Sequence, residues 1–400
     1  MISKKMKAQI EGGSAIRALF EEGKIMADKY GAENVCDFSL GNPNLPPPES
    51  FKNAVISVLN EEEPVYVHGY MNNGGYESVR AAIAASINKR FGTAFGVKNI
   101  IMSVGAAGGI NATLKTLLDP GDEVVVFAPF FGEYRAYTAN YDGVLVEVPA
   151  NPPTFQPDIA GLEKALSPRT KAVIVNTPNN PTGVVYTEES VIAIADTLRN
   201  KEAEYGTSIY LIADEPYREL VYDSDIVVPY LTKYYKNTIV GYSFSKSLSL
   251  PGERIGYVVI PDEADDYKDL FDGIVTATRI SGFVNAPSLV QLAVAKCLDE
   301  QADIEFYGRN RDLLYNGLTD AGYECVKPDG AFYLWVKTPV EEAEFINICK
   351  EHMMVVVPGS SFGGPGYVRL AYCISPDVIK KSIPRFKEII KENHDYRLSR

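Results

Sequence analysis

The sequence predicts an α/β fold: a large domain with a mostly parallel, mixed sheet sandwiched by helices, plus a smaller α+β domain. Seven short apolar segments follow one another between residues 100 and 260, and helical or turn-rich stretches separate most of them. This alternation is typical of a parallel sheet that is covered on both faces. At 400 residues and 46% hydrophobic content, the chain can bury the core of such a domain and of a second one.

The apolar segments define the expected strands of the large sheet, which are 100–104, 123–127, 143–148, 172–176, 209–213, 238–242 and 257–260. Helices are expected over 6–30, with an interruption at Gly12-Gly13, and over 49–59 and 76–90. The C-terminal part predicts a helix from 287 to 298, strands at 333–336, 355–357 and 367–373, and a final helix over 375–391.

A proline-rich stretch, Pro46-Pro47-Pro48, cannot continue a helix and indicates a boundary between domains. We therefore expect an N-terminal arm and small-domain segment over 1–48. The large domain, which would hold the cofactor described below, is expected over 49–287, and the small C-terminal domain over 288–400.

Charge and composition exclude several classes of partner. A formal net charge of -13 argues against binding to nucleic acid or to an anionic membrane. The N-terminus lacks the apolar core of a signal peptide, and no apolar run reaches the roughly 18 residues that a membrane span needs. The three histidines show no metal-ligand spacing, so no metal site is predicted. The five scattered cysteines fit reduced thiols, so we expect a cytoplasmic protein.

Lys246 is the first candidate for chemistry. It lies among four serines, including Ser243 and Ser245, on a connection between two apolar segments, and Arg254 follows eight residues later. Functional groups are common on such connections. Taken alone, Lys246 could equally be a surface charge in a serine-rich loop.

The run 103–111, SVGAAGGIN, lies between an expected strand and an expected helix. Small residues such as Ala106 and Ala107 let the backbone N–H groups at a helix start approach a phosphate. The run contains neither a G-x-G-x-x-G fingerprint nor a Walker lysine, which disfavours NAD and ATP. The alternative is a tight packing turn between strand and helix.

Two further segments follow buried strands. NTPNNPTG, residues 176–183, presents Asn180 in a turn, and the bond Asn180-Pro181 is a candidate for a cis peptide. Asp214 and Tyr217 come at the carboxyl end of another strand, where open α/β sheets bind ligands. The alternatives are an ordinary Asn/Pro turn and a helix-capping aspartate.

Phe131 and Arg369 complete the set. Phe131 either stacks on a flat ring or fills the core. Arg369 lies within the apolar run 367–372, where an arginine needs a partner, and a carboxylate suits its forked donors.

The order of these features resembles the class I/II aminotransferases, which are pyridoxal-phosphate enzymes of the aspartate aminotransferase fold. The resemblance extends from Gly41 to Arg369, and the motifs NNPTG and SFSKSLSLPGERIGY are its most specific parts. It implies that Lys246 forms a Schiff base with the cofactor and later moves the substrate proton. It also implies that Asp214 pairs with the ring nitrogen, and that Tyr217 and Asn180 contact the ring oxygen.

The resemblance further implies that Phe131 stacks on the ring of pyridoxal 5'-phosphate. The phosphate would lie against the backbone of Ala106 and Ala107. Side-chain donors would come from Ser243, Ser245 and Arg254. The alanines and Gly108 replace more polar residues of many relatives, so backbone donors must suffice there.

Tyr70 matches the tyrosine that such enzymes lend to the phosphate of a neighbouring subunit, which implies a homodimer with shared active sites. Arg369 matches the arginine that binds the substrate α-carboxylate, with Asn180 and Gly41 in the same pocket. The resemblance also implies that the bond Ala128-Pro129 is cis. Around the substrate we also expect residues 14–17, Tyr134 and Tyr333, with Arg279 of the neighbouring subunit as a further candidate.

The implied reaction is the transfer of an amino group between an L-amino acid, best matched by aspartate or an aromatic one, and a 2-oxo acid such as 2-oxoglutarate, by a ping-pong mechanism. A pyridoxal-phosphate-dependent lyase on the same fold, such as a C-S lyase or a decarboxylase, is the first alternative. A ligand-binding regulator without catalysis is the second.

Overall fold

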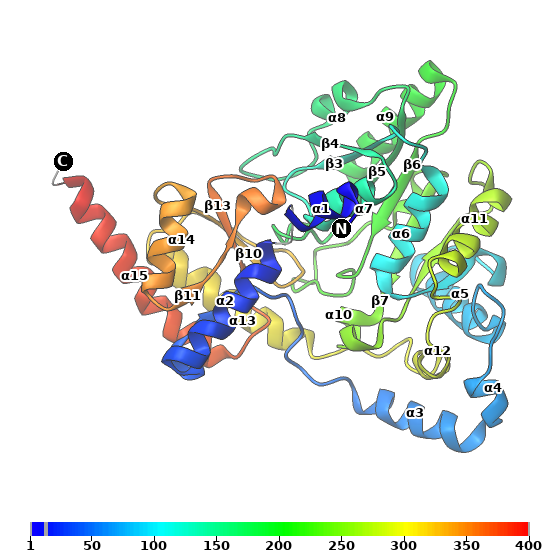
Figure 1. Ribbon diagram of the computed structural model, residues 1–400, viewed down its shortest axis with the longest axis horizontal. Helices are drawn as coiled ribbons and strands as arrows, with labels where there is room; N and C mark the ends of the chain where they lie inside the picture. Colours follow the sequence, from blue (N-terminus) through cyan, green and yellow to red (C-terminus); the bar gives the residue numbers. More distant parts are fainter. Residues whose placement is uncertain (1, 12–14, 399–400) are drawn as a thin grey trace.

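The computed structural model describes residues 2–11 and 15–398 and confirms the predicted fold class (Figure 1). The large sheet has seven strands in the order β2-β8-β7-β6-β5-β3-β4. Strands β7, β6, β5, β3 and β4 run parallel, whereas β8 is antiparallel to both β7 and β2, so the sheet is mixed. The bounds are β2 Ile100–Ser103, β3 Glu123–Phe127, β4 Val144–Val148, β5 Thr170–Asn176, β6 Tyr210–Asp214, β7 Thr238–Ser243 and β8 Gly256–Val259.

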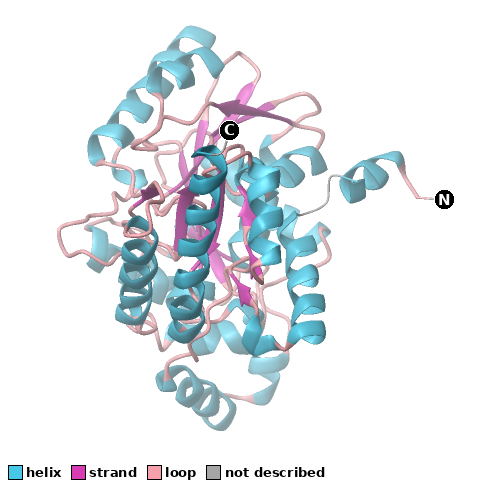
Figure 2. Cartoon of the chain, turned by 90° about the vertical axis from the view of Figure 1, so that its left-hand side faces the viewer, coloured by secondary structure: helices cyan, strands magenta, loops and turns pink. Residues whose placement is uncertain are grey.

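Helices cover both faces of this sheet (Figure 2). Successive residues of β3 point to opposite faces. Val124 belongs to an apolar cluster with residues of α6 and α7, and Val125 belongs to a second cluster with residues of α5, α8, α9 and α12. Both sides of the strand are therefore apolar, as a covered parallel sheet requires. The helices of the large domain are α3 Glu49–Glu61, α4 Pro64–His68, α5 Glu77–Phe91, α6 Gly105–Leu117, α7 Glu133–Asn140, α8 Ile159–Ala165, α9 Glu188–Tyr205, α10 Phe244–Ser247, α11 Tyr267–Ile280 and α12 Ser288–Ala295.

The small domain joins the two ends of the chain. Its antiparallel sheet has the order β12-β13-β10-β9, and β1 near the N-terminus pairs in parallel with β11 near the C-terminus. Strand β1 therefore lies beside β11. Helix α1 Lys4–Glu11 lies against the large domain, where Lys5 donates to the carboxylate of Asp142 at 3.0 Å. The elements of the small domain are α2 Ala15–Tyr30, β1 Cys36–Asp37, α13 Ile304–Thr319, β9 Cys325–Val326, β10 Tyr333–Lys337, α14 Glu342–Glu351, β11 Met354–Val355, β12 Val357–Pro358, β13 Tyr367–Ala371 and α15 Pro376–Leu398.

One expected helix and one expected strand differ from the structure, and some expectations are not tested by it. The helix expected to reach residue 298 ends at Ala295, because the next amides bond to carbonyls three residues earlier. The expected strand 355–357 is split between β11 and β12, which pair with different partners. The interruption at Gly12-Gly13 lies outside the described residues, and the domain limits at 48/49 and 287/288 stay predictions.

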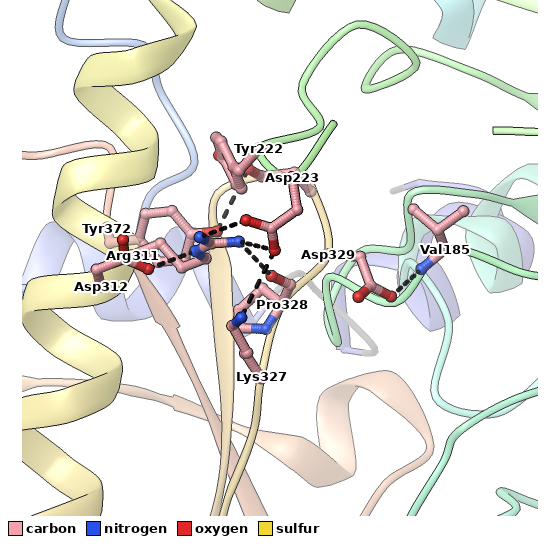
Figure 3. Close-up of polar contacts among 10 residues, drawn as sticks. Val185, Tyr222, Asp223, Arg311, Asp312, Lys327, Pro328, Asp329 and Tyr372 are labelled. Carbon is pink, nitrogen blue, oxygen red and sulfur yellow. Dashed lines mark hydrogen bonds and ion pairs between the residues drawn. The ribbon is translucent and has the colours of Figure 1, made fainter. Parts of the chain in front are cut away.

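A polar cluster links the two domains (Figure 3). Arg311 of α13, whose side chain is 5% exposed, donates to the carboxylate of Asp223 at 3.0 and 3.2 Å and to the carbonyl of Pro328 at 3.3 Å. Nearby, the Asp329 carboxylate accepts a hydrogen bond from the backbone N–H of Val185 at 2.9 Å. These contacts hold the chain that follows β6 against the small domain.

Within residues 2–11 and 15–398, none of the helices has both the length and the apolar content that crossing a membrane requires.

Candidate active site

A pocket of about 250 Å³ opens where the carboxyl ends of β5, β6 and β7 face the small domain. These strands are in register, with Asn176 beside Asp214 and Asp214 beside Gly241, so the residues that end them reach the same edge of the sheet. The pocket brings together most of the predicted site residues, namely Gly41, Ala106, Ala107, Phe131, Asn180, Asp214, Tyr217, Ser243, Ser245, Lys246, Arg254 and Arg369.

Lys246 lies in the short helix α10, directly after β7. Its Nζ donates to the carbonyl of Gly41 at 2.7 Å. Burial lowers the pKa of the ammonium to about 8, the charges of Arg369 and Arg254 add to the shift, and Cys373 opposes it. A lysine with this pKa is substantially neutral slightly above physiological pH, so it can act as a nucleophile and as a base.

Asp214 is the last residue of β6 and is buried. Its Oδ2 accepts a hydrogen bond from the hydroxyl of Tyr134 at 2.6 Å, whereas its buried Oδ1 has no hydrogen-bond partner among residues 2–11 and 15–398. Burial raises the pKa of this carboxyl to about 7, with Glu215 adding to the shift and the Tyr134 bond opposing it. The unpaired Oδ1 therefore suits a ligand group that carries a proton.

Arg369 in β13 is almost fully buried. It donates through Nη1 to Oδ1 of Asn180 at 3.1 Å and through Nη2 to the carbonyl of Ser39 at 2.6 Å. In the part of the chain that the structure describes, its Nε has no hydrogen-bond partner, and burial lowers the pKa of the guanidinium. Because no carboxylate bonds to this arginine within the described residues, its charge is available for an anionic ligand in the pocket.

Two tyrosines, Tyr217 and Tyr333, line the pocket together with Lys246, Asp214 and Arg369. The hydroxyls of Tyr217 and Tyr333 lie 2.8 Å apart, and the guanidinium of Arg369 lies 4.4 Å from the centre of the Tyr333 ring. A side chain at Gly41 would overlap the Tyr333 hydroxyl, so this close approach requires glycine. Tyr217 and Tyr333 thus present hydroxyls to the middle of the pocket.

One corner of the pocket collects hydrogen-bond donors. Ala106 and Ala107 lie in the first turn of α6, where backbone N–H groups lack acceptors within the helix. The hydroxyls of Ser243 and Ser245 lie 2.7 Å apart. A Cβ on Gly105, whose φ is +67°, would stand 2.8 Å from Nη2 of Arg254. Backbone donors, hydroxyls and a guanidinium at a helix start make a site for a phosphate-sized anion.

The bonds Asn180-Pro181 and Ala128-Pro129 are both cis, as predicted. The sequence reasoning missed Asn176, whose side chain bridges two segments of the site. Its Nδ2 donates to the carbonyl of Asp214 at 2.8 Å, and its Oδ1 accepts from the N–H of Asn180 at 2.7 Å. Asn176 ends a buried strand, as Asp214 does, and this position is the sequence feature that could have identified it as a site residue.

Tyr70 is the predicted site residue that lies elsewhere. It is 93% exposed and, with Tyr66 and Met71, lines a separate surface depression. Arg279, in the last turn of α11, is also exposed and does not line the pocket. Whether either residue serves a neighbouring subunit stays a prediction. The segment 14–17 was also expected to line the pocket. Ser14 and the side chains of residues 15–17 lie outside the part of the chain that the structure describes.

The fold and the pocket together define a class of enzyme. The sequence profile described as "Aminotransferase class I and II" matches residues 33–386, so the chain belongs to this family and is an aminotransferase. The family uses pyridoxal phosphate.

Particular relatives agree with this assignment. The chain is 32% identical over 366 residues to a "Probable aspartate/prephenate aminotransferase" of Thermus aquaticus, covering 88% of this chain and 91% of the relative. It is 31% identical to "Aromatic-amino-acid aminotransferase 2" of Thermococcus litoralis, covering 95% and 96%. A crystal structure of an amino transferase from Eubacterium rectale matches with 45% identity and a TM-score of 0.95, covering 98% and 99%. Aspartate aminotransferase from Thermus thermophilus with maleate matches with 28% identity and a TM-score of 0.85, covering 97% and 99%.

Proposed function

We propose that this aminotransferase binds pyridoxal 5'-phosphate and moves an amino group between an L-amino acid and a 2-oxo acid by a ping-pong mechanism. The observation that carries the proposal is the convergence of Lys246, Asp214 and Arg369 in one pocket. A nucleophilic amine, a carboxylate with an unpaired oxygen and a free guanidinium are the three groups that this chemistry needs.

The residues present fit the cofactor. When bound, pyridoxal phosphate supplies an aldehyde carbon and a ring that accepts electrons from the substrate. The unpaired Oδ1 of Asp214 can accept a hydrogen bond from the ring nitrogen. Phe131 offers a flat surface for stacking, and the Tyr217 hydroxyl and the Asn180 amide are the donors for the ring oxygen.

The donor-rich corner fits the phosphate group. We assign the phosphate to the backbone of Ala106 and Ala107, with Ser243, Ser245 and Arg254 as side-chain donors. Because the chain carries a net charge of -13, a local cluster of donors is needed to hold this anion.

Arg369 would bind the substrate α-carboxylate. Its free Nε and its hydrogen bond to Asn180 support this assignment, since the bond fixes the plane of the guanidinium. Gly41 would close the same end of the pocket through its backbone. The substrate Cα would then lie within the pocket that Lys246 also lines. Lys246 Nζ would take the proton from this Cα and deliver it to the cofactor carbon.

The site is proposed to be completed by a second copy of the chain, with Tyr70 of the partner subunit reaching the phosphate. The surroundings of this tyrosine support the assignment, because Tyr70, Tyr66 and Val65 are all exposed and apolar residues gathered on a surface indicate a partner. The cytoplasmic location remains part of the proposal, and it is supported by the five free cysteines.

We propose aspartate or an aromatic amino acid as the amino donor, with 2-oxoglutarate as the acceptor. The relatives from Thermus aquaticus and Thermococcus litoralis, which are named for aspartate and for aromatic amino acids, support these two substrate classes.

A panel of amino acids tests this proposal. The purified protein, loaded with pyridoxal phosphate, is incubated with each amino acid and 2-oxoglutarate, and glutamate is measured. We expect glutamate with aspartate or an aromatic donor. Turnover of cysteine-type substrates to pyruvate and ammonia without a 2-oxo acid would instead indicate a lyase, and the absence of any turnover together with tight partner or DNA binding would indicate a regulator.

A further inference from the structure

We infer that Tyr134 is a positioning residue that orients the Asp214 carboxylate and favours its charged form, so that its free oxygen can pair with the ring nitrogen of the cofactor. The inference rests on the proposed function and adds a residue to it. At the sequence level, Tyr134 is expected only to line the substrate pocket, yet Tyr134 is 1% exposed and its hydroxyl bonds to a carboxylate.

The hydrogen bond from Tyr134 gives the two carboxylate oxygens of Asp214 different roles. The Tyr134 hydroxyl donates to Oδ2 at 2.6 Å, which leaves Oδ1 as the acceptor that remains in the pocket. A carboxylate held at one oxygen by a fixed donor can turn only a little, because rotation would break a charge-assisted hydrogen bond. Tyr134 therefore sets the direction in which Oδ1 faces.

The Tyr134 ring is itself held firmly. Tyr134 lies at the second residue of α7, and its ring stacks with Phe130 at 6.4 Å and meets Phe131 edge-on at 5.6 Å. The same ring belongs to the apolar cluster between the sheet and α6. Because Phe131 is also the ring proposed to stack on the cofactor, Tyr134 links the stacking residue to the carboxylate.

The donor also stays protonated. Burial raises the pKa of the Tyr134 hydroxyl well above its ordinary value, and the neighbouring Asp214 adds to this shift. The hydroxyl is thus a donor throughout the working pH range. Its bond counteracts the effect of burial on Asp214 and favours the ionised carboxylate, which is the form that pairs with a protonated ring nitrogen.

The test compares two cofactors on the cofactor-free protein and measures binding alone. Wild type and Tyr134→Phe are titrated with pyridoxal phosphate and with an analogue in which the ring nitrogen is replaced by carbon. We expect the substitution to raise the dissociation constant of pyridoxal phosphate about tenfold, the usual effect of losing a hydrogen bond to a charged group. Binding of the carbon analogue, which offers Asp214 no N–H, should not change.

Tyr235→Phe is the matched control. Tyr235 is also 1% exposed, and its hydroxyl donates to the carbonyl of Ile209 at 2.7 Å, outside the pocket. This substitution removes the same atom and a comparable buried hydrogen bond, so thermal unfolding should change similarly in both variants. The dissociation constants of Tyr235→Phe should equal those of wild type.

Two other results are distinguishable. Equal dissociation constants for wild type and Tyr134→Phe with both compounds, or an equal loss with both, would overturn the inference and leave the proposed function intact. A wild-type protein that binds neither compound would contradict the proposed function itself.

Discussion

At the scale of single residues, the pocket holds two groups whose pKa values are shifted towards each other. Burial raises the pKa of Asp214 to about 7 and lowers that of Lys246 to about 8, so both groups titrate near neutrality. Shifts of this kind gather at catalytic sites, where a base must be neutral and still basic. The shifts arise from the same cause, since burial disfavours the charged form of an acid and of an amine alike.

The lowered pKa of Lys246 predicts how cofactor loading depends on pH. Only the neutral amine attacks an aldehyde, and its fraction increases with pH until the pKa is passed. With a pKa of about 8, the rate of loading should increase up to about pH 8 and be constant from about pH 9 to 10. Stopped-flow absorbance of the lysine-bound cofactor measures this rate. A rate that still increases about tenfold between these two values would show an ordinary lysine, with a pKa near 10.5.

At the residue level, the sequence predicts the site well where the chemistry demands a particular residue. Lys246 among serines and Arg369 within an apolar run are conspicuous because a buried charge is unusual. Asn176 and the bond of Tyr134 to Asp214 were not predictable in this way, because asparagine is common in turns and tyrosine in cores. The role of Asn176 depends on the register of β5 and β6, and that of Tyr134 depends on the contact between α7 and the end of β6.

At the scale of elements, periodicity predicts the strands of the large sheet to within about two residues, because both faces of every strand except the edge strand β4 are buried. It fails where pairing decides the outcome. The expected strand 355–357 reads as one apolar run, yet its first part pairs with β1 and its second with β13. The order of the strands across the sheet was likewise not predictable from the residues.

The interdomain cluster predicts a stability effect at this scale. Arg311→Ala removes buried hydrogen bonds to Asp223 and Pro328 and should lower the free energy of unfolding by about 2 kcal/mol. Because Asp223 is partly exposed, water can solvate the carboxylate that is left, which limits the loss. Chemical denaturation measures the change.

Arg309→Ala is the control on the same helix. The Arg309 side chain is 63% exposed and forms only ion pairs of 3.5 and 3.6 Å with Asp303 and Glu305. Its removal should change the free energy of unfolding by less than about 0.5 kcal/mol. Equal losses for both variants would show that the buried cluster does not hold the two domains together.

At the scale of the whole molecule, the proposed dimer places Tyr70 and Lys246 of one active site on different chains. The surface around Tyr70 supports this arrangement, since Tyr66, which lines the same depression, is 43% exposed and the adjacent Val65 is 85% exposed. Apolar residues gathered on a surface indicate a partner.

Mixed dimers test the sharing of sites. Lys246→Ala lacks the lysine and Tyr70→Ala lacks the lent tyrosine, so each homodimer has two damaged sites. A dimer with one chain of each kind would have one intact site, and we expect about half of the wild-type activity per dimer. Mixed dimers no more active than the average of the two parents would contradict the lending of Tyr70.

The central claim is that Lys246 and its pocket transfer an amino group, and a single half-reaction tests it most directly. Wild type and Lys246→Ala, each loaded with pyridoxal phosphate, are mixed with an amino donor and no 2-oxo acid, and the 2-oxo acid formed is counted per subunit. We predict about one equivalent from wild type, which then stops, and essentially none from Lys246→Ala. Continued product formation by wild type, or an equal yield from both proteins, would contradict the account.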